Sequence, residues 1–188
     1  MLPPILFTAR PGDIAPAAAA DDFGTRLCAE APRLRRLAHR LLGWRAGADE
    51  LDDVVQDALL KAWRHRDGFR GEASLGTWLV RIVLTTCHDH VRRRQLRYRL
   101  FGWLLPAEPE APRAGPGDVE GGAEPAAMRV ALQRLAHADR EVLVLRYLEQ
   151  RDIAAIATLL ACSRNAVDAR LSRARRRLRT ELEREGAR

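Results

Sequence analysis

A group of carboxylates near residue 50 has the residue type and spacing that could support catalysis. The group comprises four aspartates within about three helical turns: Asp49, Asp52, Asp53 and Asp57. Asp53 and Asp57 are four residues apart and share one face of a helix, so they could hold a divalent metal for phosphodiester cleavage. Gln56 and Leu60 occupy the same patch, and no nearby histidine in the sequence pairs with it. We therefore predict no catalytic residue, no metal site and no cofactor, and keep a metal-dependent nuclease as an alternative.

The same helix face also suits contact with another protein. Helical spacing from Asp49 to about Arg66 gathers apolar residues on one arc and leaves a polar arc opposite. On that polar arc, Leu60 is an apolar residue surrounded by charge, which is typical of a protein interface. A solvated acidic face with one exposed leucine fits the spacing equally well.

Arginines dominate the stretch from Asp152 to Arg179. Its spacing predicts two helices joined by a tight turn, with Asp152 and Ser163 as their N-caps, which is the pattern of a helix-turn-helix. We expect no left-handed conformation at Ala161 in the turn, because that conformation favours glycine. An amphipathic helix with a solvated basic face is the alternative. The residues predicted to contact duplex DNA are Ser163, Arg164, Asn165, Asp168, Ala169, Ser172, Arg173 and Arg176.

A second basic helix is predicted from Leu75 into the nineties, with Ser74 as its N-cap. The connection before it contains Phe69, Arg70 and two glycines. One face of the helix packs, and another carries Arg81, Thr85, His88 and Arg92. The helix ends in VRRRQLRYRL, which includes Arg93 and Tyr98, and arginines with an aromatic ring suit phosphates and unstacked bases. The alternative is a basic helix terminus stabilised by the helix dipole.

The overall composition narrows the class of protein. The 188 residues carry a net charge of +7, which suits a polyanionic partner, although a membrane surface would also attract such a chain. Three widely spaced cysteines indicate thiols in a reducing compartment, so we expect a cytoplasmic protein without a zinc site. No apolar run approaches the length of a membrane span, and MLPPILFTARPGD does not fit a signal peptide, so we predict no membrane insertion.

The predicted fold is all-α, with two small helical domains joined by a flexible acidic linker. Residues 102–125 are dense in proline and glycine and carry five acids against one arginine, Arg113. We predict helices near 25–43, 49–66, 75–95, 128–135, 140–148, 153–160 and 164–182. The predicted organisation is a flexible tail over 1–22, a first domain over 23–101, the linker over 102–125 and a second domain over 126–188.

The two domains together resemble a bacterial RNA polymerase sigma factor of the extracytoplasmic-function (ECF) group. In the first half the resemblance rests on DELDDVVQDALLKAWR, FRGEASLGTWLVRI and DHVRRR. In the second it rests on LQRLAHADREVLVLRYLE, IAAIATLL and ARLSRARRRL. Two unrelated sets of motifs in order are far more specific than one helix-turn-helix. The resemblance implies a sigma domain 2-like helical bundle and a sigma domain 4-like helix-turn-helix.

The resemblance implies a role for each surface. Members of this group bind core RNA polymerase, direct it to promoters and are usually restrained by an anti-sigma factor. The residues similar to those that dock on the clamp helices of polymerase are Asp53, Gln56, Asp57 and Leu60. Those similar to the part that captures the melted minus-ten element are Phe69, Arg70, Arg81, Thr85, His88, Arg92 and Arg93. The helix after Ser163 is similar to the one that recognises the minus-thirty-five element as duplex.

This chain departs from the group's pattern at several positions. Thr85 stands where asparagine is usual, Asp168 where a basic residue is common, Ala169 where serine is common and Ala161 where glycine is common. A carboxylate at position 168 could accept a hydrogen bond from a cytosine amino group, so we expect an unusual minus-thirty-five preference. The alternative function is a stand-alone helix-turn-helix regulator that binds duplex DNA without polymerase and leaves the acidic face unused.

Overall fold

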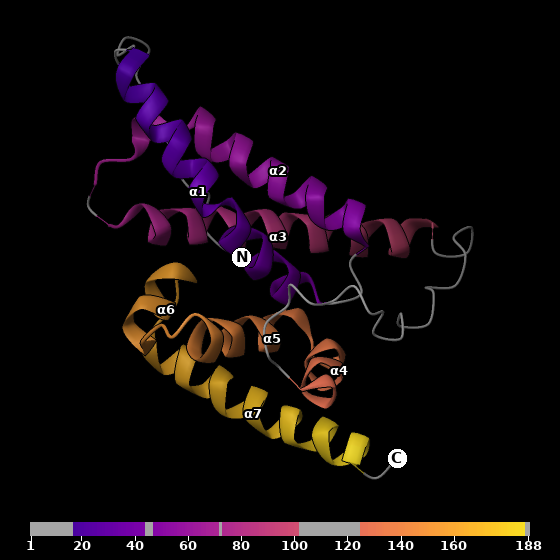
Figure 1. Cartoon of the computed structure of the whole chain (residues 1–188). Coiled ribbons are helices and arrows are strands. Elements are labelled where there is room, and N and C mark those ends of the chain that lie inside the picture. The colour runs from indigo at the N-terminus through magenta and orange to yellow at the C-terminus, as the bar shows by residue number, and fades with distance from the viewer. Residues whose placement is uncertain (1–16, 44–46, 72, 102–124, 187–188) are drawn as a thin grey trace. The chain divides into compact units, whose positions relative to one another are not determined.

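The computed structural model describes residues 17–43, 47–71, 73–101 and 125–186. Every regular element in these ranges is a helix and none is a strand, which confirms the all-α prediction (Figure 1). The chain divides into two compact units, one built mainly from α1 to α3 and the other from α4 to α7. The predicted linker lies outside the described residues except for Pro125, as do residues 1–16 of the predicted tail.

The first unit consists of three long helices and one short turn. Its elements are α1 (Ala17–Leu42), α2 (Ala48–Arg64), the 3-10 turn η1 (Arg66–Gly68) and α3 (Leu75–Phe101). α2 and α3 pack side by side and run in opposite directions (Figure 1). The buried face of each helix supplies aliphatic side chains to one core, as the helical spacing predicts. The core residues include Leu34, Leu37, Leu51, Val54, Ala58, Leu79, Val80 and Val83.

The first helix begins earlier than its sequence suggests. α1 starts at Ala17, whereas the sequence predicted a helix start near residue 25. Alanine is the strongest helix former, so the run Ala17 to Ala20 favours an early start of the helix. This extension brings Phe23 into α1, where its side chain is only 8% exposed.

Four aromatic rings join the three helices at one end of the first unit. The ring centroid of Phe23 lies 6.3 Å from that of Trp63, 6.4 Å from that of Phe69 and 6.2 Å from that of Trp78. The Phe69 and Trp78 centroids are 5.5 Å apart. Tilted and edge-on ring pairs at such distances stabilise beyond the area that they bury. Through Phe69, the cluster therefore fixes the loop between η1 and α3 against α1 and α3.

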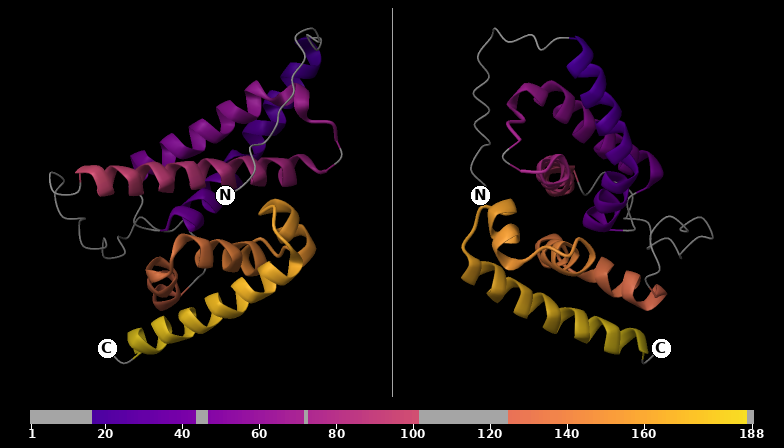
Figure 2. Two further views of the ribbon diagram at one scale, coloured as in Figure 1. Left: turned by 180° about the vertical axis from the view of Figure 1, so that it is seen from behind. Right: turned by 60° about the vertical axis from the view of Figure 1, so that its left-hand side comes forward.

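The second unit packs three short helices against one long one. Its elements are α4 (Ala126–Arg134), α5 (His137–Leu143), the π-helical turn η3 (Val144–Leu148), α6 (Ile153–Leu159) and α7 (Arg164–Gly186). α7 runs along one side of α4, α5 and α6 (Figure 2). The second helix of this unit starts at His137, earlier than predicted, and its last turn widens to the π form. In the described part of the chain, no helix is both long enough and apolar enough to cross a membrane.

Candidate nucleic-acid and protein interfaces

The structure places the four predicted polymerase-binding residues together on the outer face of α2. Asp53, Gln56, Asp57 and Leu60 are all exposed, and Leu60 keeps 43% of its surface open. They form the rim of a groove of about 330 Å³ between α2 and α3. The other lining residues are Val54, Lys61, Thr86, Asp89, His90 and Arg93. We call this set of four α2 residues the acidic face.

Polar bonds between α2 and α3 fix the two ends of the groove. Glu50 Oε1 lies 2.6 Å from His90 Nε2 and 3.4 Å from Arg94 Nη1. Farther along, Lys61 Nζ donates to Thr86 Oγ1 at 3.2 Å and lies 3.7 Å from a carboxylate oxygen of Asp89. These bonds set the register of the two helices.

The acids of the acidic face remain available for a partner. Within the described residues, the carboxylates of Asp53 and Asp57 make no hydrogen bond or ion pair. The fold brings His90 into the same groove, where its ring pairs with Glu50 and not with Asp53 or Asp57. The groove also holds Lys61 and Arg93, whose positive charges disfavour a divalent metal ion, so this donor set does not suit a nuclease.

α3 carries a basic row on a different side from the groove. Arg81, Thr85, His88 and Arg92 recur at helical spacing and form one stripe, with both arginines exposed. Arg93 does not belong to this stripe, because the helix turns it toward α2, where it lines the groove. The predicted set of minus-ten residues is therefore divided between two faces.

The hydroxyl of Thr85 is already used within its own helix. Its Oγ1 donates to the carbonyl oxygens of Arg81, at 3.1 Å, and Ile82, at 2.9 Å. The single hydroxyl proton is occupied, so only the oxygen lone pairs of Thr85 remain for a bound base. Thr85 can thus accept from a base but not donate to it in this conformation.

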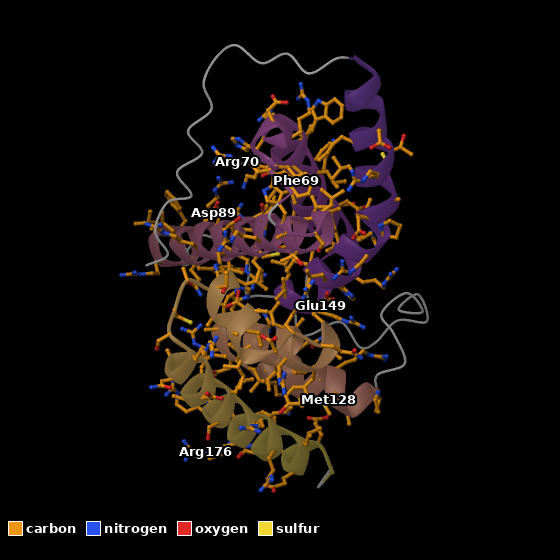
Figure 3. All side chains as sticks on the ribbon, turned by 90° about the vertical axis from the view of Figure 1, so that its left-hand side faces the viewer. Phe69, Arg70, Asp89, Met128, Glu149 and Arg176 are labelled. Carbon is orange, nitrogen blue, oxygen red and sulfur yellow. The ribbon has the colours of Figure 1, made fainter. Side chains whose placement is uncertain are left out.

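The loop before α3 presents Arg70 and holds Phe69 inward. Phe69 is part of the aromatic cluster, whereas Arg70 is exposed (Figure 3). Gly71 follows with φ +73°, a conformation that L side chains rarely adopt, so glycine is needed for the chain to turn after Arg70. The geometry makes Phe69 the anchor of the loop and Arg70 its available cation.

The helix-turn-helix predicted for the second unit is present. Asp152 Oδ1 accepts from the backbone N–H of Ala155 at 2.6 Å, and Ser163 Oγ accepts from that of Ala166 at 3.2 Å. Both predicted N-caps are confirmed. The Ser163 oxygen therefore caps the start of α7.

The expectation for Ala161 is wrong. Ala161 has φ +49°, in the left-handed region. The backbone N–H of Cys162 donates to the carbonyl oxygen of Ala157 at 3.0 Å, and the backbone N–H of Ala161 donates to the carbonyl oxygen of Thr158 at 3.4 Å. The two bonds together form a Schellman cap. These bonds require a left-handed residue at 161, and alanine adopts that conformation at a cost of roughly 1 kcal/mol.

α7 separates a packed face from an exposed basic face. Val167, Leu171 and Ala174 are buried. The exposed face carries the remaining predicted residues, with Arg176 projecting outward in Figure 3. These are Arg164, Asn165, Asp168, Ala169, Ser172, Arg173 and Arg176. Arg179, one turn beyond Arg176, is also exposed on this side and was not in the predicted set, although the same helical spacing would have included it.

Ion pairs hold α7 against the rest of its unit. The guanidinium of Arg177 pairs with the carboxylate of Asp139 in α5. Toward the end of the helix, Arg134 of α4 pairs with Glu181 and Glu185. These contacts leave the face with Arg173 and Arg176 open. Arg177 therefore helps to hold α7 in its unit, whereas Arg173 and Arg176 stay exposed to solvent.

The fold and both faces define a class: a helical protein of two compact units, with an exposed acidic face in one unit and a basic helix-turn-helix in the other. Comparison with known families agrees with this class. Sigma-70 region 2 matches residues 29–97, and Sigma-70, region 4 matches residues 126–178. The chain belongs to the RNA polymerase sigma factors of the ECF group.

Individual relatives support the assignment. The chain is 32% identical over 152 residues to the RNA polymerase sigma factor NccH of Alcaligenes xylosoxydans xylosoxydans, covering 79% of this chain and 82% of the relative. It is 34% identical over 154 residues to the ECF RNA polymerase sigma factor SigG of Mycobacterium tuberculosis, covering 70% of this chain and only 41% of that longer protein. A solved structure of the sigma factor RpoE in complex with the anti-sigma factor NepR from Bartonella quintana matches with a TM-score of 0.69 and 27% identity. That match covers 87% of this chain and 98% of RpoE.

Proposed function

We propose that this protein binds core RNA polymerase and directs it to specific promoters, where it starts transcription. The first domain (23–101) binds polymerase and the melted minus-ten strand, and the second (126–188) binds the minus-thirty-five duplex. The observation that carries the proposal is the acidic face, whose carboxylates have no partner among the described residues although basic side chains lie in the same groove.

The acidic face fits a basic protein surface with an apolar pocket. Leu60 supplies an apolar anchor, and Asp53 and Asp57 supply charge beside it. An anchor that is desolvated on binding and ringed by charge is the usual form of an interface hot spot. A stand-alone DNA-binding regulator would have no use for an exposed leucine surrounded by acids.

The basic row of α3 suits a single DNA strand. Arg81 and Arg92 are eleven residues apart, which corresponds to about 16 Å of helix and matches a short stretch of phosphates. Thr85 lies between them and offers lone pairs to an unstacked base. Arg70 extends the positive charge into the loop, and His88 belongs to the same stripe.

The second domain recognises duplex DNA through the exposed face of α7. Arg173 and Arg176 are placed to contact phosphates, while the residues nearer Ser163 face the base edges, since the start of a recognition helix enters the major groove. Arg93, although part of the predicted minus-ten set, is better placed to assist polymerase binding from the groove.

The protein acts by binding, without chemistry of its own, and works in the cytoplasm, where polymerase and DNA are found. We also propose an anti-sigma factor as a partner, a protein that covers the acidic face. The support is the similarity to RpoE, whose structure was solved in complex with NepR.

The test combines polymerase binding with transcription. Full-length protein is mixed with core RNA polymerase, passed over a size-exclusion column and assayed on a library of random promoters. The proposal predicts co-elution and transcription from a defined subset of the library. Leu60→Ala should weaken co-elution, whereas Leu100→Ala, which alters a leucine that is 57% exposed on α3, serves as the matched control. Duplex binding without polymerase binding would instead support the stand-alone regulator.

A further inference from the structure

Asp168 is an isolated carboxylate on the basic face of α7. It is exposed, and it is the only acidic residue of the helix between Arg164 and Thr180. Among the described residues its carboxylate has neither a hydrogen bond nor an ion pair. Helical spacing places Arg164 one turn before it and Ser172 one turn after it, on the same side. Asp168 therefore sits in the middle of the surface that faces DNA.

Local structure does not account for this carboxylate. The N-cap of α7 is Ser163, so Asp168 does not cap the helix. Asp168 is the fifth residue of α7, and the favourable effect of the helix dipole on an acid fades beyond the first turn. Close to phosphates a negative charge weakens binding. A group that costs affinity and packs against nothing has the properties of a specificity determinant.

The chemistry of the major groove limits what Asp168 can accept from. A carboxylate only accepts hydrogen bonds, so it is repelled by the acceptor atoms of guanine and by the O4 of thymine. Adenine offers an amino donor but places the N7 acceptor beside it. Cytosine presents its N4 amino group to the groove as its hydrogen-bonding group.

We propose that Asp168 specifies a cytosine in the duplex element that α7 recognises. The inference rests on the proposed function, because it requires α7 to lie in the major groove of a promoter. It adds to that function the identity of a base and of the side chain that selects it.

The test is a promoter selection with four forms of the full-length protein, each assembled with core RNA polymerase. The forms are the wild type, Asp168→Ala, Asp168→Asn and the control Glu183→Ala. Glu183 is also an exposed acid of α7 and lies fifteen residues farther along, so its replacement changes the charge equally at a distance of about 22 Å. Promoters transcribed from a library randomised over the upstream element are sequenced.

The wild type should favour cytosine at one position by about tenfold, the scale of one mismatched base pair. Asp168→Ala should abolish that preference without weakening binding to unselected duplex, since a repulsive charge is removed. Asp168→Asn should shift the preference to adenine, because an amide can bond both N6 and N7 of that base. Glu183→Ala should keep the cytosine preference.

Identical preferences for the wild type and Asp168→Ala would overturn the inference and leave the proposed function intact. Loss of a preference for a base other than cytosine would also overturn it. If no promoter is transcribed by any form, the proposed function fails and the inference fails with it.

Discussion

The acidic face on α2 and the basic face on α7 are both single-helix surfaces, yet they differ in one decisive way. The acidic face combines two carboxylates with an apolar side chain, Leu60, that is 43% exposed. In α7, none of the described large apolar side chains is exposed, and arginines dominate. Protein interfaces are built around desolvated apolar anchors, whereas nucleic-acid interfaces are built around charge. The difference supports our proposal that the two faces bind different classes of partner.

The two faces are also supported differently. The helix that carries the acidic face is fixed on its inner side by the core and by bonds to α3 through Glu50 and Lys61. α7 is fixed by three buried residues and by ion pairs such as Arg177 with Asp139. A substitution in the core of the first unit should therefore disturb the acidic face more than a substitution on its surface does.

The largest expected effect comes from reversing the charge of the acidic face. Asp53→Lys with Asp57→Lys should weaken binding to core polymerase by about a thousandfold, because like charges brought together at an interface cost several kcal/mol. The measurement is a titration of labelled full-length protein with core polymerase. Glu183→Lys, a charge reversal on α7, is the control and should leave polymerase affinity nearly unchanged. A loss of log affinity in Glu183→Lys about half that of the double variant, in proportion to the charge changed, would show that net charge, and not this face, governs binding.

The next effect tests how the aromatic cluster of the first unit stabilises the helices, including α2, which carries the acidic face. Phe23→Ala removes the ring that contacts Trp63, Phe69 and Trp78, and should destabilise the first domain by about 3 kcal/mol. Hydrogen exchange measured on peptides of the full-length protein should show faster exchange in α1 to α3 and unchanged exchange in α7. Phe101→Ala alters a ring that is 52% exposed and should change neither. Faster exchange in both domains would contradict the separation of the two units.

The third effect concerns the charge of α7. Arg173→Ala with Arg176→Ala should weaken promoter binding and lower the slope of log affinity against log salt by about 1.8, which corresponds to two phosphate contacts. Filter binding of the holoenzyme at several salt concentrations measures that slope. Arg184→Ala is the control, since Arg184 bonds Glu181 at 2.7 Å and lies toward the end of the helix. An unchanged slope in the double variant would exclude phosphate contact by this face.

Much of the fold and both faces could be predicted because they follow from local periodicity. The spacing of Val167, Leu171 and Ala174 placed the buried side of α7, and the spacing of Asp53, Asp57 and Leu60 placed the exposed side of α2. The two N-caps were also predictable, since Asp152 and Ser163 bond donors within three residues.

Features that depend on contacts distant in the sequence could not be predicted. Nothing local indicates that His90 and Arg93 line a groove with residues of α2, because that depends on how the helices pack. The same holds for Phe69, predicted as a DNA contact and found in an aromatic cluster with Phe23. At Ala161 the local preference itself was overridden, because two backbone hydrogen bonds and the packing of α6 against α7 impose the turn.

The smallest expected effect comes from the left-handed conformation of Ala161. Ala161→Gly should raise the stability of the second domain by about 1 kcal/mol, because glycine adopts φ +49° without the clash of a Cβ atom. Ala169→Gly is the matched control: in the interior of α7, where φ is helical, the same replacement should lower stability by about 1 kcal/mol. Hydrogen exchange of α6 and α7 in the full-length protein measures both. Opposite signs for the two substitutions would show that backbone conformation, and not loss of a methyl group, determines the effect; destabilisation by both would mean that the left-handed turn at 161 is not strained. Neither substitution should alter polymerase binding, since we propose the acidic face as the surface that binds polymerase.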